Sequence, residues 1–149
     1  MAQYSALEIA KWLTKWAAAN EADMTNMKLQ KLLYYAQGRY LAEYGKPLFE
    51  EEIEAWSHGP VVPSVYRAFK DNGSEEIPPS EDFEFSSIDR DTTKFLQKIW
   101  NTYGGIATWK LRKMTHNEDP WAKRFADAER NVVIPKDALR EWFEKSPNK

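Results

Sequence analysis

The sequence predicts a mainly α-helical single domain over residues 1–149, with about six to seven helices and a small two- or three-stranded antiparallel β element. At 149 residues the chain is near the commonest domain size and can bury a core without disulfides. Apolar residues recur at helical spacing along most of it, with capping residues, prolines and glycines at the expected ends. Residues 49–56 instead alternate between apolar and charged positions, as a half-buried strand does.

The first two helices are predicted from their caps. Ser5 and Glu8 have the spacing of a capping box, in which each side chain satisfies a backbone N–H of the first turn. Thr25 caps a longer second helix, which Gly45 ends. The stripe that this second helix should bury consists of Leu29, Leu32, Leu33, Ala36 and Tyr40.

Residues 54–69, EAWSHGPVVPSVYRAF, are predicted to turn from the strand into a third helix. Gly59 allows a tight turn, and Pro63 should be the first helical residue because a proline disfavours helix at the position before it. Gly73 should end this helix. His58 is expected to be a turn residue rather than an acid–base catalyst.

The second half of the chain is predicted to be loop and helix. The acidic, proline-containing residues 74–88 indicate a loop, with a short strand at 83–85 that would pair with the first strand. Four helices follow. The fourth is capped by Asp89 or Asp91 and stopped by glycines 104–105, and the fifth is capped by Thr108. The sixth is opened by Asp119 and Pro120 and carries Trp121 and Phe125, and the last is opened by Ile134 and Pro135.

Composition and motifs argue against an enzyme. The chain has no cysteine, which excludes disulfides, thiolate nucleophiles and cysteine-based metal sites. No nucleophile elbow, phosphate loop or dinucleotide motif is present. Glu118 and Asp119 beside His116 could help to bind a cation, but acidic residues are also favoured at a helix start. We expect no catalytic residues, metal or cofactor. Without a signal peptide or an apolar run of ~20 residues, the sequence favours a cytoplasmic, non-membrane protein.

Charge and aromatic content favour a protein partner. Aromatic residues make up 14% of the chain, and large rings serve both cores and interfaces. Residues 46–91 carry four basic and twelve acidic side chains, net −8, whereas residues 92–149 carry twelve basic and seven acidic, net +5. Such a dipolar pattern can steer a charged partner, although solvated acidic loops and basic helices would look the same.

Nucleic-acid binding is the competing interpretation of the second helix, and we consider it unlikely. The helix offers polar side chains suited to base edges: Lys28, Gln30, Lys31, Gln37 and Arg39. It is long for a recognition helix, however, and the chain has a net charge of −2. The same helix carries adjacent Tyr34 and Tyr35, which cannot both occupy the centre of one stripe. We therefore expect one of them at its edge, either under the acidic loop or on a binding face.

Several motifs together resemble the SocA-like, or Panacea, antitoxin domain family. Residues 28–70, KLQKLLYYAQGRYLAEYGKPLFEEEIEAWSHGPVVPSVYRAFK, are similar to its lysine-leucine-glutamine helix, its tyrosines and its Ala-Trp-x-x-Gly-Pro-Val turn. THNEDPW at 115–121 and IPKDALREWF at 134–143 resemble its later segments. The resemblance covers most of the chain.

This resemblance implies a bacterial or prophage antitoxin of a toxin–antitoxin system, encoded beside its toxin and linked to phage defence. Relatives usually neutralise a cognate toxin by direct binding, and one related activity is an adaptor that delivers a toxin to a ClpXP-type protease. Many relatives carry an added N-terminal DNA-binding module, but only one helix precedes Lys28 here, so we do not expect operator binding. The toxin itself is not specified by the sequence.

Two sets of residues follow as predictions. The scaffold set consists of Leu29, Leu32, Leu33, Tyr34, Trp56, Gly59, Pro60, Val61, Pro120 and Trp121. The partner-binding set consists of Gln30, Lys31, Tyr35, Gln37, His58, Tyr66 and His116. Polar and aromatic side chains beside shared motifs are where a common scaffold can vary its contacts.

Overall fold

The computed structural model describes residues 2–125 and 132–146. Over these residues the chain forms seven α-helices and one three-stranded antiparallel sheet, as predicted. The elements are α1 (Ala6–Ala19), α2 (Asn26–Tyr44), β1 (Ile53–Trp56), β2 (Gly59–Val61), α3 (Pro63–Ala68), α4 (Arg90–Ile99), α5 (Thr108–His116), α6 (Asp119–Ala122), β3 (Val132–Ile134) and α7 (Lys136–Lys145).

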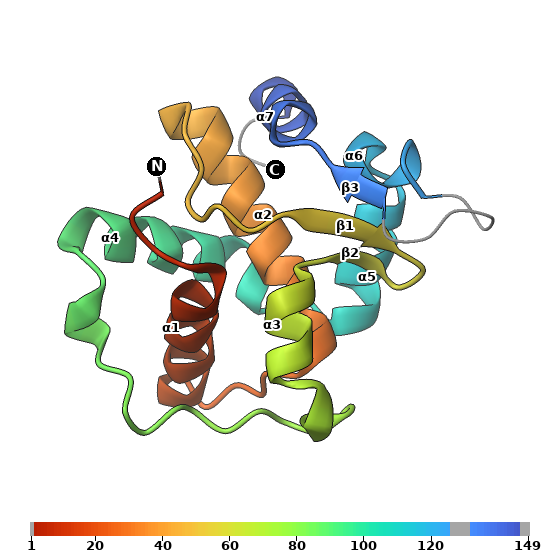
Figure 1. The fold of residues 1–149 in the computed structure, drawn as a ribbon. Helices are drawn as coiled ribbons and strands as arrows, with labels where there is room; N and C mark the ends of the chain where they lie inside the picture. Colours follow the sequence, from red (N-terminus) through yellow and green to blue (C-terminus); the bar gives the residue numbers. More distant parts are fainter. Residues whose placement is uncertain (1, 126–131, 147–149) are drawn as a thin grey trace.

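Helix α2 lies at the centre of the fold (Figure 1). It contacts α1, α3, α4, α5, α7 and β2, so neighbours cover nearly all of its circumference. Of its predicted apolar stripe, Leu29, Leu32, Leu33 and Ala36 are buried as expected and Tyr40 is half-buried. The polar residues Gln30, Lys31 and Gln37 are buried too. Gly38 makes this enclosure possible, because a Cβ there would lie only 2.1 Å from the Phe143 ring of α7.

The helix caps confirm the sequence predictions in the first half of the chain. Ser5 and Glu8 form the capping box, with Oγ–N and Oε1–N distances of 3.1 and 2.9 Å. Thr25 caps α2, Gly45 ends it in the left-handed conformation (φ 72°), and Pro63 is the first residue of α3.

The sheet has the order β2-β1-β3. The β1–β2 hairpin pairs Trp56 with Gly59, and the other edge of β1 pairs Ile53 with Ile134. The predicted strand at 83–85 is wrong: Phe85–Ser87 forms a short 3₁₀ helix, and β3 takes the place beside β1. Phe85 packs on Trp12 and Trp16 of α1, and the Phe83 carbonyl accepts a hydrogen bond from Lys15 Nζ at 2.7 Å.

Several helix ends differ from the predictions. Helix α3 ends at Ala68, and Gly73 ends the short 3₁₀ helix Lys70–Asn72 that follows it. Ala107 and Glu118, rather than Thr108 and Asp119, are the N-cap residues of α5 and α6. Helix α6 ends at Ala122, so Phe125 lies beyond it, stacked on Trp121. After α4 the chain continues as a π-helical turn, Trp100–Gly104, before it leaves the helix at Gly105.

Candidate partner-binding groove

Two glutamine side chains of α2 form hydrogen bonds with backbone groups of neighbouring segments. Gln37 Nε2 donates to the Phe49 carbonyl at 2.7 Å, and its Oε1 accepts from the Leu48 amide at 2.8 Å. Gln30 Oε1 accepts from the Val62 amide at 2.8 Å, just before α3. Because buried backbone groups need partners, these side chains fix the segment before β1 and the start of α3 against the central helix.

Both adjacent tyrosines are buried, and a shared carboxylate explains how. Tyr34 and Tyr35 are 0% and 1% exposed, so the expectation that one lies at the edge of the stripe is wrong. Their hydroxyls donate to Glu118 Oε1 and Oε2 at 2.8 and 3.0 Å. Burial raises the pKa of Glu118, and the hydrogen bonds from the two tyrosines offset part of this rise. Tyr35 also stacks on Tyr103, with ring centroids 4.1 Å apart.

The hairpin turn is fixed by both conformation and space. Gly59 has φ 118°, where a side chain is strained, and a Cβ on it would lie 2.7 Å from Lys31 Cε. Trp121 Nε1 donates to the Trp56 carbonyl at 2.7 Å and ties the hairpin to α6. His58 is exposed at the turn. The rest of the predicted scaffold set is buried: Leu29, Leu32, Leu33, Pro60, Val61 and Pro120.

A groove of about 440 Å³ lies between the start of α2, the hairpin and α3, and we call it the Lys31 groove. It contains four residues of the predicted partner-binding set: Gln30, Lys31, His58 and Tyr66. Trp56 and Tyr66 meet edge to face, with ring centroids 5.1 Å apart, and both are half-buried. The other lining residues are Thr25, Asn26, Met27, Val61, Gly73, Ser74 and Thr108.

The remaining members of the predicted set lie outside this groove. Tyr35 and Gln37 are enclosed in the core and have no surface for direct contact in the isolated chain. His116 is half-buried and stacks on Trp121, with ring centroids 4.0 Å apart. Burial, followed by the charges of Arg112 and Lys31, lowers the pKa of His116. A role in partner binding stays a prediction for the whole set.

Lys31 has an unusual environment at the floor of the groove. Its side chain has no exposed surface, and Nζ has no hydrogen-bond partner among the residues that the structure describes. Burial, together with the nearby charge of Arg112, lowers the pKa of Lys31 to about 7. A substantial share of the side chain is therefore neutral near physiological pH.

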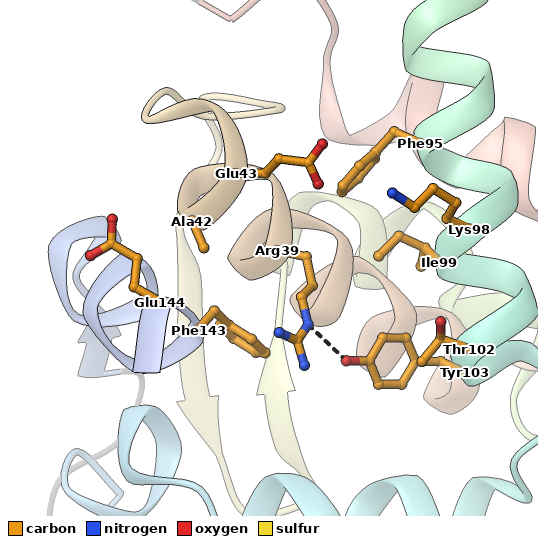
Figure 2. Close-up of a pocket in the computed structure, with 10 residues that line it drawn as sticks. All are labelled: Arg39, Ala42, Glu43, Phe95, Lys98, Ile99, Thr102, Tyr103, Phe143 and Glu144. Atoms are coloured by element: carbon orange, nitrogen blue, oxygen red, sulfur yellow. Dashed lines mark hydrogen bonds between the residues drawn. The ribbon is translucent and has the colours of Figure 1, made fainter. Parts of the chain in front are cut away.

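A second cavity of about 460 Å³, the Arg39 pocket, lies between α2, α4 and α7 (Figure 2). Arg39 Nε donates to the Tyr103 hydroxyl at 3.0 Å, and another guanidinium nitrogen donates to the Ser146 carbonyl at 2.5 Å. The guanidinium also lies 5.0 Å from the centroid of the Phe143 ring. Sequence reasoning did not identify this pocket, because α4 and α7 are distant from α2 in the chain.

Other site types find little support in the described part of the chain. No group of three or more His, Asp or Glu side chains is placed there to hold a metal ion. None of the helices that the structure describes is both long and apolar enough to cross a membrane.

Comparison with known proteins identifies one family. Residues 29–122 match the family described as "Antitoxin SocA-like, Panacea domain". The protein "Antitoxin SocA" of Caulobacter vibrioides (strain NA1000 / CB15N) is 48% identical over 69 residues. That segment is 46% of this chain and 37% of the relative, so the match spans little more than a third of the relative's length. No solved structure matches the chain.

Proposed function

Because the chain belongs to the SocA-like, Panacea-domain family of antitoxins, we propose that it neutralises a cognate toxin by binding it directly, without catalysis. The observation that carries the proposal is the family match over residues 29–122. This span includes most of α2, the hairpin, α3 and α5, and therefore most of the residues that line the Lys31 groove. We propose that the neutralisation takes place in the cytoplasm.

The Lys31 groove has the physical features of a protein-binding surface. Trp56 and Tyr66 are half-buried rings in a concave surface, and binding energy commonly concentrates on such aromatic anchors. The hydrogen bond from the Val62 amide to Gln30 fixes the start of α3 beneath them. A surface that is already ordered loses less conformational entropy when a partner binds.

The burial of α2 weakens the nucleic-acid alternative. Of the side chains suited to base edges, Gln30, Lys31 and Gln37 are buried in the isolated chain. Arg39 is engaged with Tyr103 and Ser146. These residues would have to leave their present positions before they could reach a groove of DNA.

The test is expression of the neighbouring gene with and without this chain, followed by co-purification. We expect the neighbouring gene to be toxic alone, and its product to be neutralised and captured when this chain is present. The same assay in cells that lack a ClpXP-type protease separates two mechanisms: neutralisation by binding persists, whereas proteolytic delivery is lost. Loss of neutralisation in those cells would replace direct binding with the adaptor function.

A matched pair of substitutions locates the surface. Tyr66→Ala should weaken toxin binding by about 1–3 kcal/mol, the cost of losing an aromatic anchor. Tyr44→Ala removes another partly exposed tyrosine, 47% exposed and outside the Lys31 groove, and should bind like wild type. Equal effects of the two substitutions would place the interface elsewhere.

A further inference from the structure

Lys31 combines complete burial with an unpaired nitrogen. An ammonium group removed from water is costly unless a carboxylate or several acceptors replace its hydration. In the residues that the structure describes, Nζ has no such acceptor. In the isolated protein, the charged form of Lys31 therefore lacks an anion or acceptor that could replace its hydration.

Lys31 lies against the groove, although its amine has no exposed surface in the isolated chain. Lys31 is one of the residues that line the Lys31 groove. The hairpin turn covers it, since a Cβ on Gly59 would lie 2.7 Å from Lys31 Cε and 3.1 Å from Nζ. A side chain at that position would collide with Lys31 and approach Thr115 Oγ1 to 3.1 Å, so the glycine allows the hairpin to pack directly on the lysine.

The lining of the groove is complementary to a negatively charged group on an apolar carrier. Its titratable residues are Lys31, His58 and Tyr66, and none of its lining residues is acidic. Arg112 is close enough to influence the amine electrostatically. Trp56, Val61 and Tyr66 supply apolar walls. An anion entering between these walls would stabilise the charged form of Lys31, which has no hydrogen-bond partner among the described residues.

We infer that the Lys31 groove receives an acidic side chain of the toxin, whose carboxylate pairs with Lys31 Nζ while the apolar part of the same loop packs on Trp56 and Tyr66. This inference rests on the proposed function and adds the chemistry that the partner must present. Pairing favours the charged amine, so carboxylate binding at pH 8 is accompanied by uptake of a proton by Lys31.

The first experiment uses the purified chain and two small probes, 3-phenylpropionate and its neutral isostere 3-phenylpropanamide. Calorimetry at pH 8 in two buffers of different ionisation enthalpy measures both affinity and proton uptake. We expect the carboxylate to bind about tenfold or more tighter than the amide, as a charge-assisted hydrogen bond predicts, with up to about one proton taken up. Equal affinities, no proton uptake, or no binding of either probe would overturn the inference.

Two lysine variants serve as a matched pair in the same experiment. Lys31→Met should remove both the carboxylate preference and the proton uptake. Lys28→Met changes another lysine of α2, which is only half-buried and outside the groove lining, and should retain both. A preference that survives in Lys31→Met would assign it to another cation. Because wild type alone compares the two probes, the test holds even if a variant does not fold.

The toxin provides the second experiment and keeps the two proposals separate. If the wild-type chain captures the toxin, Lys31→Met should weaken capture at least about tenfold and Lys28→Met should not. Capture with no loss in Lys31→Met overturns the inference and leaves direct binding intact. Failure of wild type to bind the neighbouring gene product overturns the proposed function, whatever the probes show.

Discussion

Two cationic side chains of helix α2, Arg39 and Lys31, lie in contrasting environments. Arg39 donates hydrogen bonds to the Tyr103 hydroxyl and the Ser146 carbonyl, and the Phe143 ring lies beside it. Lys31 is more deeply buried, and Nζ has no hydrogen-bond partner among the described residues. Arginine keeps its charge when buried, whereas lysine can lose its proton. The contrast indicates that Arg39 stabilises the fold, and it supports our proposal that the groove beside Lys31 receives a ligand.

The largest effect on stability is expected from Tyr35→Ala, which tests whether the part of α2 near Arg39 stabilises the fold. The substitution empties an aromatic-sized space beside Tyr103 and removes one partner of Glu118. We expect a loss of about 3–5 kcal/mol in the free energy of unfolding, measured by chemical denaturation. Tyr35→Phe, which keeps the ring, should lose about 1–2 kcal/mol. Near-wild-type stability of Tyr35→Ala with weaker toxin binding would instead move Tyr35 to the binding surface.

The second prediction concerns the pH dependence that Lys31 gives to stability. Its pKa is about 7 in the folded chain and about 10.5 in an unfolded one, so the unfolded state binds more protons between these values. Stability should therefore rise with pH, by about 3 kcal/mol from pH 7 to 9.5, and fall again as pH drops toward 7. The nearby charged or titratable groups are Arg112, His58 and His116.

Denaturation of wild type and Lys31→Met across this pH range checks the prediction. The variant should lack the rise, because methionine fills the space without a titratable group. Tyrosines whose pKa is raised in the fold, such as Tyr34 and Tyr35, lower stability as pH rises above about 9, but they do so equally in both proteins. Parallel profiles for the two proteins would show that Lys31 is not the responsible group.

Gly59→Val should have the third largest effect, since Gly59 covers Lys31. A β-branched residue at φ 118° costs about 1–3 kcal/mol in backbone strain, and its Cβ would also press on Lys31 Cε. We expect a lower melting temperature in a thermal scan. Gly73→Val, at φ 56° with open space around it, provides a control for backbone strain alone. A Gly59→Val protein that melts like wild type yet fails to neutralise would contradict the structural interpretation of the turn.

The smallest effect should come from long-range charge. Residues 46–91 and 92–149 have net charges of −8 and +5, and exposed charges accelerate encounter with a complementary partner. The association rate with the toxin should fall as salt rises from low to physiological concentration, where screening acts beyond about 8 Å. Stopped-flow kinetics at several salt concentrations would measure this, and a constant rate would exclude steering.

The sequence predicted local structure well where one residue determines it. Ser5, Thr25, Gly45 and Pro63 act through nearby backbone groups, so their spacing alone located helix ends. The strand β3 was missed because its partner β1 lies far away in the chain, and no local pattern records that pairing.

The residues of the candidate site were predicted in part, but their burial was not. Gln30 and Lys31 were expected to lie on the surface because they are polar, and both do line the Lys31 groove. Their complete burial could not be foreseen, since the periodicity of α2 shows one apolar face but not that neighbours also cover the polar one. Gln37 and Tyr35, which were also expected near the surface, are enclosed by neighbouring elements in the same way.

The close approach of Gly38 to Phe143 has a consequence for synthesis on the ribosome. Strand β3 and helix α7 emerge after α6, yet α7 covers the middle of α2 and β3 completes the sheet beside β1. A nascent chain that has reached only α6 must leave these apolar surfaces open, where they are prone to aggregate. The fold of the described residues is therefore complete only when translation has passed α7, and a chain that stops before that helix should aggregate or be degraded.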